Sequence, residues 1–202
     1  MIINTQKNKI AIIDYGASNL QSVANALTSL GRSFEIINDP KKLVDFDKVI
    51  LPGVGAAGSA MEKLKESGFA DILPKVKVPT LGVCLGLQLF ADFSSEGNTK
   101  CLSIISGEVK KFKNDLKVPH MGWNKVEFIK ESSLTSGIPN NSFFYFVHSY
   151  YLETKDEFVI GKTAYGINFP AIIQKDNFYA VQFHPEKSGE WGLKLLSNFC
   201  DL

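Results

Sequence analysis

The first half of the chain alternates short apolar runs with segments of helical periodicity, and this alternation limits the fold more than any other feature. Four runs are typical of buried strands: "KIAIID", "SFEIIN", "DKVILPG" and "VPTLGVC". Between them, "NLQSVANALTSLG" and "GSAMEKLKESG" carry apolar residues three and four positions apart, which predicts amphipathic helices. The expected inward-facing residues are Leu20, Val23, Ala24, Leu27, Leu30, Ala60, Met61 and Leu64, with Gly31 placed to end the first helix. Such a pattern indicates a largely parallel sheet covered on both faces.

The second half has a different texture. From about residue 106 to residue 183 it is rich in β-branched and aromatic residues, with turn signals between the runs. These runs are "GEVKKF", "WNKVEFI", "SFFYFVHSYYL", "FVIGKTAYG", "PAIIQ" and "FYAVQF", and they predict antiparallel strands. A final helix is expected over 188–199. No repeat or linker divides the chain, so we expect one α/β domain over 1–202, with a three-layer, mostly parallel central sheet, helices on both faces and an antiparallel strand extension.

The composition excludes several classes of protein. The 202 residues are 45% hydrophobic and 21% charged, with a formal net charge of +1, which does not favour nucleic acid or an anionic membrane as a partner. No apolar run is long enough for a membrane span, and the first residues lack the apolar core of a signal peptide. Three widely spaced cysteines, Cys84, Cys101 and Cys200, fit a reducing compartment such as the cytoplasm. They suggest neither a disulfide framework nor a metal site, and we expect no cofactor.

The segment "GVCLGLQ" puts Cys84 between Gly82 and Gly86, where a predicted strand meets a predicted helix. A residue at this corner projects from the carboxyl edge of a parallel sheet, where ligands of such sheets bind. The turn needs small neighbours, and the pattern is that of the nucleophile elbow G-x-S-x-G with sulfur in place of oxygen. The N–H groups that open the following helix favour a thiolate. A buried structural cysteine is the alternative, but the paired glycines favour a nucleophile.

A thiolate nucleophile needs a base and a third group that orients the base. His184 ends the run "FYAVQFH", and Pro185 stops the strand directly afterwards, which leaves the imidazole at the same sheet edge as Cys84. Glu186 lies two residues further on, within reach of the ring. We therefore predict His184 as the base and Glu186 as its orienting partner.

The other two histidines have weaker claims. His148 lies inside the aromatic-rich run "FFYFVHSYYL" and is expected to be a hydrogen-bonded histidine or part of a site wall. His120, in "VPHMGWN", has a proline before it and a glycine shortly after it, so a loop position with a partner contact or surface role is expected.

Acyl chemistry also requires hydrogen-bond donors for the oxyanion. One predicted donor is the backbone N–H of Leu85, the residue after the nucleophile. A second glycine-rich corner, "LPGVG", follows another buried strand and precedes a helix, and no G-K-[ST] follows it as in a phosphate-binding loop. We expect the N–H groups of Gly53, Val54 and Gly55 to face the same pocket.

These motifs carry a family resemblance that extends over essentially the whole chain. The sequence resembles the class-I (triad) glutamine amidotransferases, which hydrolyse glutamine to glutamate and ammonia through a cysteinyl thioester. The shared marks are "PGVG", "GVCLGLQ" and "HPE". Within the family the chain is most similar to the glutaminase subunits of imidazole glycerol phosphate synthases, enzymes of histidine biosynthesis. "HMGWN" and "HPEKSG" are the most specific segments of that resemblance.

The resemblance implies a flavodoxin-like fold, Cys84, His184 and Glu186 as the triad, L-glutamine as the substrate and no cofactor. It also implies a heterodimer with a separate (β/α)₈-barrel cyclase subunit that receives the ammonia. Glutamine contacts are expected from Gly53, Gln88, Ser149 and Tyr150. Partner contacts are expected from the loop of Pro119, His120, Met121, Gly122, Trp123 and Asn124, although Trp123 fits an ordinary core position equally well.

Three other functions share part of this pattern. A close paralogue that feeds ammonia to a sugar-amidating enzyme would carry the same motifs. Another cysteine hydrolase or a stress-type protein would keep the elbow but would have no use for Gln88 or "HPE". A catalytically idle interaction module is expected to lack at least one residue of the triad, and this sequence has Cys84, His184 and Glu186. One departure from the family is Ser18 in "DYGASN", where glycine is usual; it predicts a different shape for the first loop, with an effect on partner contact and none on the triad.

Overall fold

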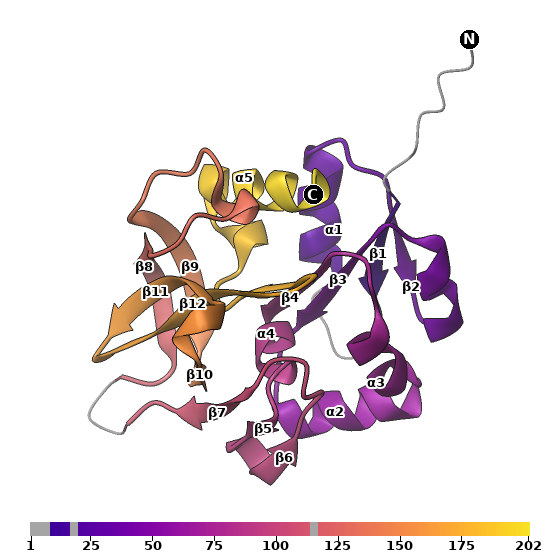
Figure 1. Ribbon diagram of the computed structural model, residues 1–202, viewed down its shortest axis with the longest axis horizontal. Coiled ribbons are helices and arrows are strands. Elements are labelled where there is room, and N and C mark those ends of the chain that lie inside the picture. Colours follow the sequence, from indigo (N-terminus) through magenta and orange to yellow (C-terminus); the bar gives the residue numbers. More distant parts are fainter. Residues whose placement is uncertain (1–8, 17–19, 114–116) are drawn as a thin grey trace.

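A nine-stranded sheet forms the centre of the protein. The computed structural model describes residues 9–16, 20–113 and 117–202, so Ser18 lies outside the described residues (Figure 1). In spatial order the strands are β2 (Phe34–Ile37), β1 (Ile10–Ile13), β3 (Lys48–Gly53), β4 (Thr80–Cys84), β13 (Phe178–Val181), β12 (Ile167–Lys175), β11 (Val159–Tyr165), β8 (His120–Phe128) and β9 (Ser142–His148).

The sheet has a parallel half and an antiparallel half. Strands β2, β1, β3, β4 and β13 pair in parallel. From β13 through β12, β11 and β8 to β9 every pairing is antiparallel. The predicted α/β class with an antiparallel extension is confirmed. The carboxyl ends of β3 and β4 meet at one edge, where Gly53 pairs directly with Cys84.

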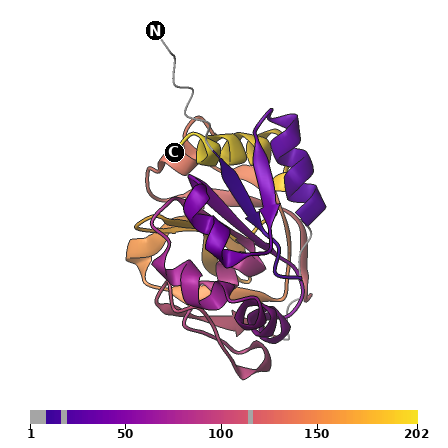
Figure 2. The same cartoon turned by 90° about the vertical axis from the view of Figure 1, so that its right-hand side faces the viewer.

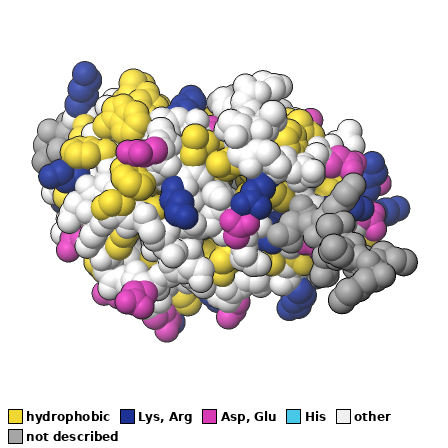
Figure 3. Space-filling model, turned by 90° about the horizontal axis from the view of Figure 1, so that it is seen from above, with side chains coloured by type: hydrophobic (Ala, Val, Ile, Leu, Met, Phe, Trp, Pro, Cys, Tyr) yellow, Lys and Arg dark blue, Asp and Glu magenta, His cyan; other side chains and the backbone are white. Residues whose placement is uncertain are grey.

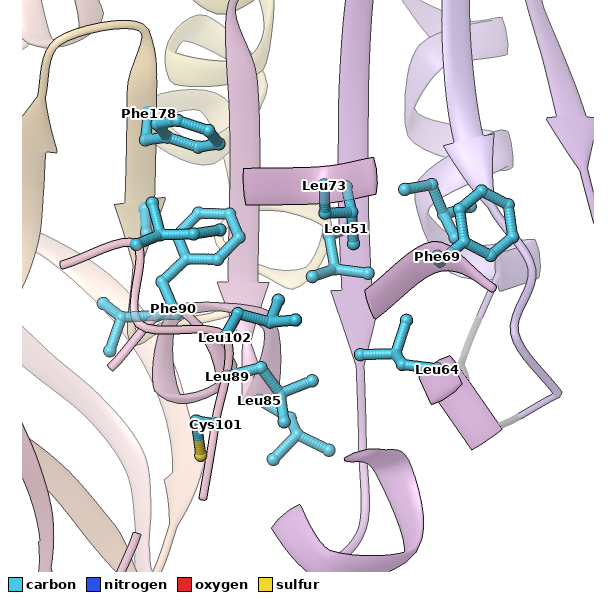
Figure 4. Close-up of a cluster of buried hydrophobic side chains, with 14 of the residues drawn as sticks. Leu51, Leu64, Phe69, Leu73, Leu85, Leu89, Phe90, Cys101, Leu102 and Phe178 are labelled. Carbon is cyan, nitrogen blue, oxygen red and sulfur yellow. The ribbon is translucent and has the colours of Figure 1, made fainter. Parts of the chain in front are cut away.

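Helices cover both faces of the sheet (Figures 1 and 2). Helices α1 (Leu20–Ser29) and α5 (Gly189–Cys200) pack on one face, and α2 (Ala57–Glu66), α3 (Phe69–Ile72) and α4 (Leu85–Leu89) lie on the other. Each face has its own hydrophobic core: the first lies under α1 and α5, and the second under α2, α3 and α4. Neighbouring residues of β3 point to opposite faces, so Ile50 belongs to the first core and Leu51 to the second. In the second core Phe90 and Phe178 meet edge to face, with ring centroids 5.6 Å apart (Figure 4).

The predicted helical stripes are confirmed, and one predicted strand environment is wrong. The inward-facing residues of α1 and α2 are buried or half-buried. Gly31 follows α1 with φ at +65°, a conformation that glycine adopts without strain. The run "SFEIIN" was expected to be a buried strand, but β2 is the edge of the sheet and Ile36 is 42% exposed.

A second, four-stranded sheet lies beside the first. Its order is β10 (Tyr150–Thr154), β7 (Gly107–Lys111), β5 (Phe93–Ser94) and β6 (Thr99–Lys100). The run "SFFYFVHSYYL" therefore supplies strands to two sheets, β9 to the large one and β10 to the small one, and Ser149 lies at the crossing. Short 3₁₀ helices complete the chain: η1 (Pro40–Asp45), η2 (Leu73–Lys75), η3 (Glu96–Asn98), η4 (Ser133–Thr135), η5 (Asp156–Phe158) and η6 (Pro185–Lys187).

The described part of the face seen from above carries no obvious field of a single sign (Figure 3). Acidic and basic side chains are interspersed on the face seen from above, and no histidine is visible there (Figure 3). All three histidines are in fact buried, with exposed fractions of 4% for His120, 6% for His148 and 2% for His184. Within the described ranges, no helix combines the length and the apolar character that a membrane crossing requires.

Candidate active site

Cys84 occupies the corner between β4 and α4 in a backbone conformation that is rare for a residue with a side chain. Its φ is 54° and its ψ is −104°. Neighbouring backbone atoms lie so close to positions 82 and 86 that only glycine fits at either one. A Cβ on Gly86 would lie 2.1 Å from the carbonyl oxygen of Leu51, and a Cβ on Gly82 would lie 2.8 Å from the backbone of Gly86. The close packing of β3, β4 and α4 therefore fixes the elbow.

Strand β13 brings His184 and Glu186 to the same sheet edge. It pairs in parallel with β4, with Val181 opposite Val83. His184 follows three residues later and precedes η6, which carries Glu186 back toward the ring. His184 Nδ1 lies 2.8 Å from Glu186 Oε1, and the two side chains are only 3% and 2% exposed.

This buried carboxylate changes the acid–base behaviour of His184. Burial lowers the pKa of the imidazole, but the Cys84 sulfur and the Glu186 carboxylate outweigh burial and raise the pKa to about 10. The ring is therefore positively charged at neutral pH. Among the described residues, His184 Nε2 and Glu186 Oε2 are buried without a hydrogen-bond partner. In the described part of the chain Nε2 thus has no competing acceptor, and the Cys84 sulfur is the larger of the two influences that raise the pKa of the ring.

Two groups surround the sulfur of Cys84. The Sγ atom lies 3.9 Å from the carbonyl oxygen of Val147, which can accept a hydrogen bond only when the sulfur carries its proton. On another side, the side-chain amide of Gln182 donates to Sγ over 3.8 Å. The sulfur is held between β9 and the end of β13, and Cys84 is 6% exposed.

A cavity of about 320 Å³ opens at this edge. Ligand pockets span roughly 300–1,000 Å³, so this size suits a small metabolite. Its wall brings together Cys84 and His184 with most of the other predicted site residues: Val54, Gly55, Leu85, Gln88, Ser149 and Tyr150. Gln88 reaches it from the first turn and a half of α4 because it is one helical turn beyond the nucleophile.

Gly53 has a different place from the one predicted for a glutamine contact. It is buried at the end of β3 and does not belong to the cavity wall. A Cβ at this position would lie 2.7 Å from the Tyr15 hydroxyl and 2.9 Å from Leu85 Cβ. Packing alone therefore requires glycine here, next to Cys84.

The family model for "Glutamine amidotransferase class-I" matches residues 11–202 of the chain. The chain belongs to the class-I glutamine amidotransferases. The resemblance inferred from "PGVG", "GVCLGLQ" and "HPE" is thereby confirmed.

Curated relatives agree with that assignment, and a solved structure of another protein shares the fold. "Imidazole glycerol phosphate synthase subunit HisH 1" of Campylobacter jejuni subsp. jejuni (strain 81-176) is 52% identical over 200 residues, which cover 96% of this chain and all of the relative. "Imidazole glycerol phosphate synthase subunit HisH" of Archaeoglobus fulgidus is 46% identical, with 96% and 98% covered. The solved structure of PurLQS from Thermotoga maritima superimposes with a TM-score of 0.73 at 16% identity, covering 96% of this chain and 98% of that one, and shows the same fold.

The cavity of the amidotransferase also contains residues that the sequence did not single out. These residues are Glu96 and Val147. His148 also lines the cavity, in agreement with the expectation of a site-wall residue. Glu96 lies in the turn "SSEGN", whose pattern signals only a turn, and the fold alone brings it to the site. Its Oε2 accepts a hydrogen bond of 2.8 Å from the Ala57 N–H at the start of α2. In the described part of the chain, no cluster of His, Cys, Asp and Glu side chains is arranged to hold a metal ion.

The segment predicted to contact a partner is a strand where a loop was expected. From His120 onward it forms β8, paired with β9, and its side chains alternate between inside and outside. Met121 and Trp123 are 62% and 56% exposed, so Trp123 is no core residue. Gly122 and Asn124 are half-buried, and Pro119 lines the cavity. The surface role expected for His120 is wrong, because its ring is buried and hydrogen-bonded to His148 at 2.9 Å.

Proposed function

We propose that this amidotransferase is the glutaminase subunit of an imidazole glycerol phosphate synthase, active in the cytoplasm. It hydrolyses L-glutamine to L-glutamate and ammonia, and it passes the ammonia to a cyclase subunit of histidine biosynthesis. The observation that carries the proposal is the buried His184–Glu186 pair at the cavity into which the strained Cys84 corner opens. The relative that is 52% identical and bears the synthase name supports the assignment to this branch of the family.

The first half of the reaction forms a thioester. The raised pKa of His184 favours an imidazolium beside the Cys84 thiolate. The sulfur attacks the side-chain amide carbon of glutamine, and the oxyanion accepts hydrogen bonds from the N–H of Leu85 and from the corner of Val54 and Gly55, all three of which line the cavity. His184 then gives its proton to the amide nitrogen, the C–N bond breaks and ammonia leaves.

The second half releases glutamate. A water molecule loses a proton to His184 and attacks the thioester carbon, and the C–S bond breaks. Glu186 keeps the imidazole oriented in both halves through the 2.8 Å hydrogen bond to Nδ1. The thiolate–imidazolium pair is then ready for the next substrate.

The cavity offers complementary groups to both ends of glutamine. Gln88, Ser149 and Tyr150 line the part of the wall that would receive the amino-acid end. Glu96 adds a carboxylate to the same wall; because its Oε2 is already bonded to Ala57, Oε1 remains as an acceptor for the α-ammonium group.

The proposed cyclase partner, a (β/α)₈ barrel, docks on the outer face of β8 and β9. Met121 and Trp123 on β8 and Phe143 on β9 are 62%, 56% and 49% exposed. Lys125 lies above the Phe143 ring at 5.5 Å. Three large apolar side chains with a cation beside them on two adjacent strands have the character of an interface centre, with Trp123 as the anchor.

The function is tested by glutamate release from glutamine, with and without the cyclase subunit from the same organism. The Cys84→Ala variant should lose activity by at least about 1,000-fold because no nucleophile remains. Cys101→Ala is the matched control, since Cys101 is also a buried thiol but lies in the second core, where burial raises its pKa to about 11. Release of glutamate by Cys84→Ala at the normal rate, or copurification with a different acceptor enzyme, would contradict the proposal.

Glu96→Gln tests the role of the added carboxylate. Loss of a charged acceptor for the α-ammonium should raise KM for glutamine by about tenfold or more while kcat changes little. The amide oxygen that the substitution introduces at position 96 can still accept the hydrogen bond from Ala57, so the fold should be kept. The unfolding midpoint should therefore be measured together with kcat and KM. An unchanged KM in a folded variant would show that Glu96 does not bind the α-ammonium group of glutamine.

A further inference from the structure

Two imidazoles that the reaction does not use face each other next to the active-site cavity. His120 on β8 and His148 on β9 are paired residues, and His120 Nδ1 lies 2.9 Å from His148 Nε2. Four aromatic rings surround the pair: Phe112, Phe146, Tyr165 and Phe169. Burial lowers the pKa of His120 to about 4. Burial, with smaller contributions from His120 and His184, lowers the pKa of His148 to about 3 against the effect of the Tyr150 carbonyl. Both rings are therefore neutral at pH 7.

The position of the proton on each ring follows from its neighbours. The carbonyl oxygen of Tyr150 lies 2.7 Å from His148 Nδ1 and accepts only, so Nδ1 of His148 carries the proton. Nε2 of that neutral ring must then accept, and the donor that faces it is Nδ1 of His120. Nε2 of His120 is left as an acceptor. The direction of the hydrogen bonds is thus the same through both rings.

The far end of this series is equally determined. The side-chain amide of Asn124 donates to His120 Nε2 over 3.2 Å and to the Ala164 carbonyl over 3.0 Å. Its Oδ1 accepts the N–H of Lys125 at 2.8 Å, which excludes the flipped amide. Asn124 lies between Trp123 and Lys125, whose side chains point to the outer face of β8.

The near end reaches the substrate pocket. The Tyr150 carbonyl also accepts a hydrogen bond of 3.1 Å from the Gln88 side-chain amide. The same amide donates to Gln182 Oε1 over 3.2 Å, and Gln182 in turn donates to the Cys84 sulfur. Gln88 and Tyr150 both line the cavity. An unbroken series of hydrogen bonds therefore leads from β8 to residues that would hold glutamine.

We propose that the series from Asn124 through His120 and His148 to the Tyr150 carbonyl is a positioning relay that holds Gln88 and Tyr150 in place for glutamine. His120 is its central positioning residue. It touches no substrate, and it acts by keeping His148 in the tautomer that donates to Tyr150. The inference rests on the proposed function for the identity of the ligand.

Nitrogen NMR of the histidine side chains in the full chain tests the direction of the relay without any reaction. At pH 7 we expect His120 and His148 to be neutral with the proton on Nδ1, and His184 to carry protons on both nitrogens. The signals are assigned by their loss in single variants. A proton on Nε2 of either His120 or His148 would reverse a hydrogen bond and overturn the proposal.

Glutamine affinity tests the positioning role. Binding is measured by calorimetry in the Cys84→Ala background, which prevents turnover. His120→Phe keeps the aromatic packing but removes both hydrogen bonds, and we expect glutamine to bind about tenfold more weakly. His120→Asn places an amide donor near the position of Nδ1 and should bind within about threefold of the parent.

Tyr165→Phe is the matched control. Its ring stacks on His120 with centroids 4.1 Å apart, and its hydroxyl donates only to the Lys117 carbonyl, outside the relay. It should leave glutamine affinity unchanged. If His120→Phe does not fold, Asn124→Ala removes the donor to His120 from a half-buried position and should weaken binding about threefold.

The outcomes separate the two proposals. If the Cys84→Ala parent does not bind glutamine, the proposed function fails. If the parent binds glutamine and folded His120→Phe binds it equally well, the relay is wrong. Equal losses in His120→Phe and His120→Asn would show that ring packing matters and the hydrogen bond does not, which also overturns the relay.

Discussion

The end of β13 and the β8–β9 pair both bury imidazoles, but the imidazole is positively charged in the first region and neutral in the second. His184 has a carboxylate at 2.8 Å and a pKa raised to about 10. His148 has aromatic rings and a carbonyl around it, and its pKa is lowered to about 3. Both side chains are almost completely inaccessible to solvent.

The comparison teaches that burial alone does not decide the charge of a histidine. Burial opposes the imidazolium in both regions, and only the region with Glu186 compensates for it. The charged ring is suited to proton transfer, whereas the neutral ring is suited to fixed hydrogen bonds. The charge on His184 also helps to keep His148 neutral.

The largest effect is expected from removing the charged ring. His184→Ala should lower kcat for glutamine hydrolysis by about 1,000-fold or more, because no group remains to protonate the amide nitrogen that leaves as ammonia. Tyr165→Phe is the matched control from the neutral region, because its hydroxyl lies outside the relay, and it should leave kcat within about threefold of the parent. Activity of His184→Ala near the normal level would show that the charged imidazole does not transfer the proton, and the proposed difference between the two regions would be wrong.

A smaller loss is expected when the carboxylate is made neutral. Glu186→Gln should lower kcat by about 100-fold, because the imidazolium loses its charged partner. The folded-state pKa of His184 lies above the unfolded value of 6.5, so the pair stabilises the folded chain fully below about pH 6.5, and this stabilisation is lost as the pH rises toward 10.

Urea unfolding between pH 6.5 and pH 10 measures that second effect. The free energy of unfolding should fall with pH in the parent and should fall less steeply in Glu186→Gln. Identical slopes would show that Glu186 does not account for the raised pKa of His184. The control is Glu190→Gln, an exposed carboxylate at the start of α5, which should behave as the parent.

The charged region was predictable from the sequence, for physical reasons. Cys84 sits between glycines at a change of periodicity, and Pro185 marks the end of the strand before it, so each signal is local. Cys84 ends β4, and Pro185 follows shortly after the end of β13; these two strands pair in parallel, so their carboxyl ends share an edge by necessity. The pairing of Glu186 with His184 could be predicted because the two residues are only two positions apart in the sequence. Their catalytic roles remain a proposal.

The neutral region was not predictable in the same way. The contact between His120 and His148 depends on the register of β8 with β9, two strands that lie 28 positions apart at these residues. Proline and glycine near His120 favoured a loop, yet Gly122 is accommodated inside the strand at φ +130°. Glu96 is a similar case, because no periodicity marks a turn that folds back over α2 and reaches the cavity.

The smallest effect is expected from the neutral ring, and it concerns stability in acid. Because the folded-state pKa of His148 lies near 3 and the unfolded value near 6.5, the unfolded chain binds the extra proton between these values. The free energy of unfolding should therefore fall as the pH decreases from 6.5, by up to about 1.4 kcal/mol per pH unit for this one group. His148→Gln keeps a donor and an acceptor but cannot titrate, so its stability should decline less steeply between pH 6.5 and pH 4. Urea unfolding at half-unit intervals in this range, with Tyr165→Phe as the control, measures the slope. If His148→Gln and the parent lose stability equally, His148 is not held neutral by the fold, and the two regions no longer differ in the charge they impose.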